Sequence, residues 1–113
     1  MAYFSDAIID LVWERAKRVE GYDPAKWRQD FAGAWIQRDQ YGIQSGLGWE
    51  IDHMVPQSHG GGDDLQNLFP LHWRNNEAKG DSTPTFKTAL SSEGNKNIEK
   101  VQSWIIPKNS QGK

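Results

Sequence analysis

The sequence of 113 residues contains no cysteine. Disulfide bonds, cysteine-ligated zinc, iron–sulfur clusters and a cysteine nucleophile are therefore excluded together. No apolar run approaches the roughly 20 residues that a membrane-spanning helix needs. The N-terminus also lacks the basic region followed by an apolar region that marks a signal peptide. We therefore expect a cytoplasmic protein with no membrane partner.

A strong excess of positive charge is also lacking, since the net charge is −2 and the pI is near 5.9. The distribution of charge along the chain is uneven. No Lys or Arg occurs between Arg38 and Arg74, and this window holds five acidic residues, whereas the chain from Arg74 onward holds seven basic and four acidic residues. The pattern fits either chance and solvation or an acidic metal pocket beside a basic surface.

The length fits one small domain, and the patterning predicts an α+β fold. Ser5 is placed to cap an N-terminal helix that runs to about Gly21. Short strands are predicted at 34–36, 49–52 and 68–71, and a helix at 72–79 that ends at Gly80. Residues 86–90 and 98–106 are expected to be extended, with a helix over 96–106 as the alternative, and 107–113 as a loose tail.

The residue types that carry chemistry gather in one stretch of the chain. Asp52 and His53 would point to opposite faces of a regular strand, so both reach one site only if the strand ends there, as Pro56 favours. In the following helix, His72 and Asn76 are four residues apart and share a face. Oxygen ligands without sulfur favour Mg²⁺ or Mn²⁺, and a free imidazole beside the ion suits a general base.

The same residues resemble the HNH endonuclease motif. The matching features are Asp52-His53-Met54-Val55-Pro56, Gly60-Gly61, Asn67-Leu68 and Asn76-Glu77-Ala78-Lys79-Gly80, with 14 residues from His53 to Asn67 and 9 from Asn67 to Asn76. The resemblance covers residues 34–80. It implies a single domain with a ββα-metal core, preceded by the N-terminal helix and followed by an extended segment or hairpin.

The resemblance also implies roles for particular residues. His53 would be the general base, and Asp52 and Asn76 would be the protein ligands of one divalent cation, Mg²⁺ or Mn²⁺. Asn67 would tie the loop by backbone hydrogen bonds and hold His53 in orientation. The ion would stabilise the departing 3′ oxygen, and the products would carry 5′-phosphate and 3′-hydroxyl ends.

Further residues receive supporting roles. Glu50 is expected to orient a neighbouring group, and His72 either packs or binds the ion. Arg74 and Lys79 are candidates for phosphate contacts. Many HNH domains bind a structural zinc through four cysteines, and the corresponding positions here are Arg38, Tyr41, His72 and Asn75. We therefore expect no structural zinc, and packing and hydrogen bonds in its place.

The function that follows is a metal-dependent DNA endonuclease that grips DNA mainly through the phosphate backbone. One active centre per chain predicts nicking by a monomer, whereas a weak dimer would cut both strands. Two alternatives stay open at this point. One is a DNA-binding or interaction module on an inactive HNH scaffold, and the other is a nuclease that acts on RNA.

Overall fold

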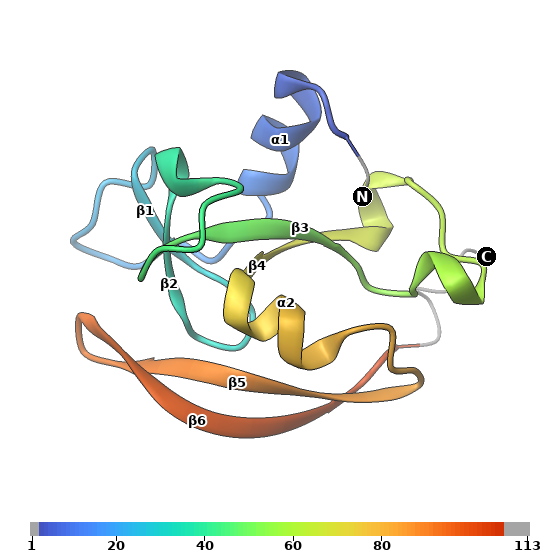
Figure 1. Ribbon diagram of the computed structural model, residues 1–113. Helices are drawn as coiled ribbons and strands as arrows, with labels where there is room; N and C mark the ends of the chain where they lie inside the picture. Colours follow the sequence, from blue (N-terminus) through green and yellow to red (C-terminus); the bar gives the residue numbers. More distant parts are fainter. Residues whose placement is uncertain (1–2, 108–113) are drawn as a thin grey trace.

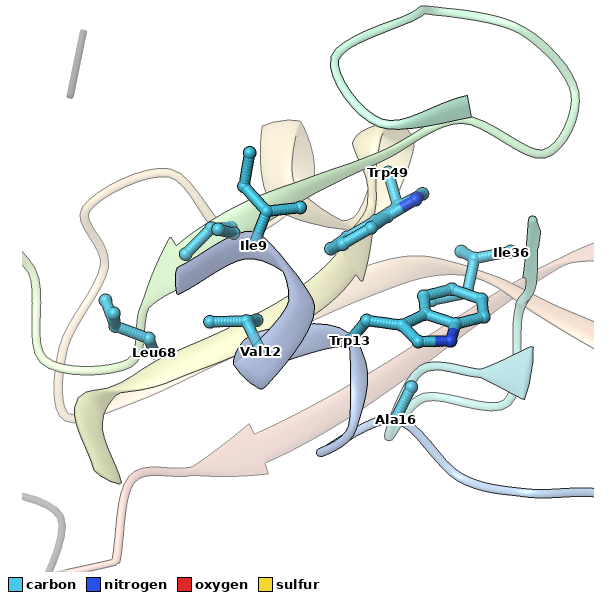
Figure 2. Close-up of a cluster of buried hydrophobic side chains, with 8 residues drawn as sticks. Ile9, Val12, Trp13, Ala16, Ile36, Trp49 and Leu68 are labelled. Carbon is cyan, nitrogen blue, oxygen red and sulfur yellow. The ribbon is translucent and has the colours of Figure 1, made fainter. Parts of the chain in front are cut away.

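A β-hairpin with a helix on each of its two sides forms the centre of the computed structural model, which describes residues 3–107 (Figures 1 and 2). The hairpin consists of β3 (Trp49–His53) and β4 (Leu68–His72), and the helices are α1 (Asp6–Trp13) and α2 (Trp73–Lys79). The expected α+β fold is confirmed. Neither helix has the length and apolar character that crossing a bilayer requires.

Within residues 3–107, the β structure consists of three antiparallel two-stranded sheets. Besides the central hairpin, β1 (Trp27–Gln29) pairs with β2 (Trp35–Gln37), and β5 (Thr85–Glu93) pairs with β6 (Lys96–Ile105). The β5–β6 hairpin curves beneath α2 (Figure 1). The expectation of two extended C-terminal segments is confirmed, and the helical alternative is wrong. The expected tail lies outside the described residues except for Pro107.

Helix α1 begins as expected, because the Ser5 side chain accepts a hydrogen bond from Ile8 N. The expected end near Gly21 is wrong, since the helix ends at Trp13. The last carbonyls of the helix, at Val12 and Trp13, accept from Arg15 N and Ala16 N. The buried Arg28 guanidinium donates to the carbonyls of Trp13, Glu14 and Ala16, and so holds the chain where it leaves the helix against a strand at 27–29 that the local pattern does not predict.

Apolar residues of α1 pack on one face of the central hairpin (Figure 2). Val12 and Trp13 from the helix meet Trp49 and Leu68 from the two strands, and all four side chains are buried. The alternation of residues in β3 explains this arrangement, because Trp49 and Ile51 lie on one face of the strand. Burial of this face fixes the register of the hairpin.

A buried carboxylate joins the β1–β2 connection to the start of α2. Asp30 Oδ1 accepts from Ala32 N (3.1 Å) and Ala34 N (2.9 Å), and Oδ2 accepts from His72 N (2.9 Å) and Asn75 Nδ2 (3.0 Å). Burial raises the pKa of Asp30 above its usual 3.8, and these hydrogen bonds oppose the rise. The four donors make the carboxylate the junction of the β1–β2 connection and the start of α2.

Asn75 extends this junction to the C-terminal hairpin. The pairing of β5 with β6 shifts register between Thr88 and Leu90. At this irregularity Asn75 Oδ1 accepts from Ala89 N (2.8 Å) and Leu90 N (2.7 Å), and Nδ2 donates to Leu90 O (3.0 Å). One buried amide thus satisfies backbone groups of β5 and fastens the hairpin to α2.

Replacing Asp30 by Asn should lower the free energy of unfolding by about 2–4 kcal/mol. An amide NH₂ in place of one carboxylate oxygen faces N–H donors and leaves them unpaired. Urea unfolding followed by circular dichroism measures the change, and Asp39→Asn, at an exposed acid, is the control and should stay within about 0.5 kcal/mol of the parent chain. Equal stability of the Asp30→Asn chain and the parent would contradict this account.

Candidate active site

The loop between β3 and β4 is closed by Asn67. Its Oδ1 accepts from Val55 N (2.8 Å), and its Nδ2 donates to Val55 O (3.2 Å) and Gly62 O (2.9 Å). Gly61 passes so close that an added Cβ would lie 1.7 Å from Val55 O. The loop therefore tolerates no side chain at this position, and the backbone ties expected of Asn67 are present.

Asp52, His53 and Asn76 line one open cavity of about 190 Å³. Strand β3 ends at His53, and Pro56 follows three residues later. Because the strand ends there, neighbouring residues that would diverge in a continuing strand both reach the cavity. Asn76 enters from α2, which begins directly after β4. The structure thus brings together the three residues expected to perform catalysis and bind the ion.

The Asp52 carboxylate lies in the interior beside a buried lysine. The side chain of Asp52 is 6% exposed and that of Lys79 is 0% exposed, with 3.3 Å between Lys79 Nζ and Asp52 Oδ2. Lys79 Nζ donates a hydrogen bond to His53 O at 3.1 Å, whereas Oδ2 accepts none within residues 3–107. Burial raises the pKa of Asp52 from 3.8 to about 6, and the charges of Lys79 and His53 only partly oppose this rise.

This burial does not fit the expected phosphate contact of Lys79, because its ammonium group cannot reach a substrate on the surface. The residue instead pairs with Asp52 and holds the end of β3 through His53 O. Arg74, the other expected phosphate contact, is partly exposed and pairs with Glu99 at 3.4 Å. Such a surface pair is weak and opens readily, so Arg74 stays a candidate.

His53 is held by an acid that the sequence does not single out. The Nε2 atom of His53 lies 2.7 Å from Asp63 Oδ1, and the His53 side chain is 12% exposed whereas that of Asp63 is 66% exposed. Asp63 follows the run Gly60-Gly61-Gly62. No local pattern marks Asp63 as a partner of His53, because the contact depends on how the loop folds back after Asn67 closes it.

Asn76 and Glu50 form a pair at the edge of the cavity. Asn76 Nδ2 donates to Glu50 Oε1 at 2.6 Å, which turns the amide so that its oxygen is the group left for another partner. Glu50 therefore orients a neighbour, as expected. Its charge adds to burial in raising the pKa of Tyr41 above 10.0.

The donor set fits a hard divalent cation that keeps most of its water. Asp52 offers a carboxylate whose Oδ2 pairs with Lys79 and accepts no hydrogen bond within residues 3–107, and Asn76 offers an amide oxygen. Within residues 3–107 no group of three or more His, Cys, Asp or Glu side chains is arranged to hold a metal. Mg²⁺ and Mn²⁺ accept such sparse oxygen sites, because water and substrate phosphate oxygens supply the remaining ligands.

The four positions that carry zinc-binding cysteines in many HNH domains are occupied by residues with protein partners. His72 Nδ1 accepts from Arg74 N and caps α2, while Nε2 lies 2.9 Å from Gly46 O. Burial lowers the pKa of His72 below 6.5. Both ring nitrogens are thus engaged, which favours packing over metal binding. Asn75 joins the Asp30 junction, Arg38 pairs with Asp10, and Tyr41 packs on Trp49.

The raised pKa of Asp52 predicts how stability changes with pH in EDTA. Between about pH 4 and pH 6 the Asp52 carboxyl keeps its proton in the native chain but has lost it in the unfolded chain. The contribution of Asp52 to the free energy of unfolding therefore falls as the pH rises through this range. Asp52→Asn should therefore be more stable than the parent chain at pH 7 by about 2–3 kcal/mol, with little difference at pH 4. Urea unfolding at several pH values measures the difference, and a pH-independent difference would contradict the assignment.

Comparison with known proteins gives one match, which covers the central hairpin and α2. No curated protein and no solved structure matches the chain. The family model described as HNH endonuclease matches residues 42–82, which include β3, the loop closed by Asn67, β4 and α2. Residues 42–82, with the cavity of Asp52, His53 and Asn76 within them, therefore form a domain of the HNH endonuclease family.

Proposed function

We propose that this chain is a metal-dependent DNA endonuclease that hydrolyses phosphodiester bonds with one divalent cation and a histidine general base. The observation that carries the proposal is the convergence of Asp52, His53 and Asn76 on one cavity. The family match supports nuclease activity in general terms. Metal dependence, the DNA substrate and the role of each residue are the further content of the proposal.

His53 takes the proton from the attacking water. A proton on Nε2, donated to Asp63, leaves Nδ1 as the nitrogen with a free lone pair. Asp63 thereby fixes both the tautomer and the ring orientation. Asn67 acts indirectly, because its ties to Val55 close the loop that carries Asp63 back to His53.

Asp52 and Asn76 hold the cation through their side-chain oxygens. When bound, the ion stabilises the charge that develops on the phosphate and on the departing 3′ oxygen. Lys79 holds the Asp52 carboxylate in place through the ion pair at 3.3 Å. Glu50 holds the Asn76 amide. The chain therefore presents two preset oxygens to the cation and keeps His53 for proton transfer.

The DNA backbone is gripped from outside the acidic cavity. Among residues 3–107, no Lys or Arg side chain lines the cavity. Exposed cations lie instead on the β5–β6 hairpin, at Lys87, Lys96 and Lys100, and Arg74 lies nearby through its pair with Glu99 on β6. Contacts of this kind position the duplex without reading its sequence. With one catalytic centre per chain, a monomer nicks one strand.

Supercoiled plasmid should be nicked by the parent chain with Mg²⁺ or Mn²⁺ and left intact in EDTA. His53→Ala should lower the rate by roughly 10²–10⁴-fold, the usual scale for loss of a general base. His59→Ala is the matched control. His59 is an exposed histidine in the loop that follows His53, and it lines neither the cavity of about 190 Å³ nor a larger pocket of about 550 Å³ beside that cavity. Gel electrophoresis of the nicked and supercoiled forms measures each rate.

The same assay separates the alternatives. Binding of the plasmid without cutting under every metal condition would favour an inactive module, and cutting of RNA with intact plasmid would favour a ribonuclease. Full activity in EDTA would overturn the metal-dependent mechanism. An equal loss of rate in the His59→Ala and His53→Ala chains would overturn the role of His53.

A further inference from the structure

A second, larger pocket of about 550 Å³ opens beside the catalytic cavity. The two share Ile51, His53, Gln57 and Asn76 as lining residues, so they form one continuous depression. The outer wall comes from the N-terminal segment and from the turn that precedes β3. A group that extends from a phosphate at His53 would therefore enter this pocket.

The wall of this pocket is aromatic. Tyr3, Phe4 and Tyr41 all line it. The Phe4 ring lies 6.0 Å from the His53 ring, centroid to centroid, with 39° between the ring planes. Tyr3 is 96% exposed, so its ring stands at the rim of the pocket and buries almost none of its surface against residues 3–107. Flat aromatic surfaces beside a phosphodiester site are suited to stacking on a nucleobase.

The charges of the pocket argue against a second phosphate. In the part of the chain that the structure describes, no Lys or Arg side chain lines it, whereas Asp6 and Glu50 do. These acids repel the sugar–phosphate backbone but accept hydrogen bonds from the exocyclic amino groups of bases. The combination of apolar rings and carboxylate acceptors therefore selects the base over the backbone.

We propose that this pocket holds one unpaired nucleobase next to the scissile phosphate, an inference that rests on the proposed nuclease function and narrows its substrate. A paired base inside a duplex is stacked on both sides and cannot enter, and extruding it costs free energy. The chain therefore favours DNA in which the base beside the cut is unpaired, as in single strands or distorted duplexes.

The test compares binding of a single-stranded oligonucleotide that contains 2-aminopurine with binding of the same strand annealed to its complement. Both are measured in EDTA at low ionic strength, so that no cutting occurs. Tyr3→Ala should weaken single-strand binding by about 10-fold and reduce the quenching of 2-aminopurine, since one stacked base is lost. Duplex binding should change by less than about 2-fold, because its bases stay stacked.

Two further variants sharpen the result. Phe4→Leu keeps apolar volume against α1 while removing the ring, and it should reproduce the effect of Tyr3→Ala. Tyr22→Ala removes another exposed tyrosine that does not line the pocket, and it should bind like the parent chain. Equal weakening on single strand and duplex, unchanged binding of both pocket variants, or failure of the single strand to bind would overturn the proposal.

Cutting assays separate this inference from the proposed function. A chain that nicks plasmid but binds single strands equally with and without Tyr3 keeps its nuclease function and loses the base pocket. A chain that binds single strands through Tyr3 but cuts no DNA keeps the base pocket and loses the nuclease function.

Discussion

The position of the candidate active site depends on one buried hydrogen bond, which Asn75 Nδ2 donates to Asp30 Oδ2 over 3.0 Å. Asp30 also holds His72 N, where β4 passes into α2, and Asn75 also holds the backbone of β5. Helix α2 has only seven residues, and so short a helix owes its stability to tertiary contacts. These buried bonds fix α2 on both sides, and α2 in turn places Asn76 and Lys79 at the end of β3. His72 and Asn75 of this network stand at two of the positions that correspond to zinc-binding cysteines in many HNH domains.

The interior of the candidate active site holds a buried charge that lowers the stability of the native state. Asp52 is buried enough for its pKa to rise to about 6, although Lys79 lies 3.3 Å away. Desolvation of the carboxylate thus outweighs the attraction of one lysine. The proposed divalent cation would add two further positive charges beside the same carboxylate and offset the cost of burial. Under this proposal, metal binding would raise the free energy of unfolding.

Local pattern predicted much of the fold but missed the contacts that depend on distant segments. Ser5, Pro56 and Gly80 marked element ends correctly, because local geometry fixes these features. The residues that carry the resemblance, Asp52, His53 and Asn76, lie around one cavity. The early end of α1 could not be predicted, since the carbonyls of Glu14 and Ala16, just after the helix, are bound by Arg28 from another segment. The partnership of Asp63 with His53 and the burial of Lys79 depend on loop closure and on helix packing. A lysine on the stripe of Asn76 looks like a phosphate contact until its partner on the neighbouring strand is known.

The central claim is that Asp52 and Asn76 hold the cation while His53 stays free as the base. Calorimetric titration of Mn²⁺ into the parent chain and three variants tests it most directly. The account predicts one ion per parent chain, affinity reduced at least about 10-fold in Asp52→Asn, a smaller loss in Asn76→Ala, and nearly unchanged affinity in His53→Ala. Loss of Mn²⁺ binding in His53→Ala, with normal binding in Asp52→Asn, would contradict this division of roles and make His53 the ligand.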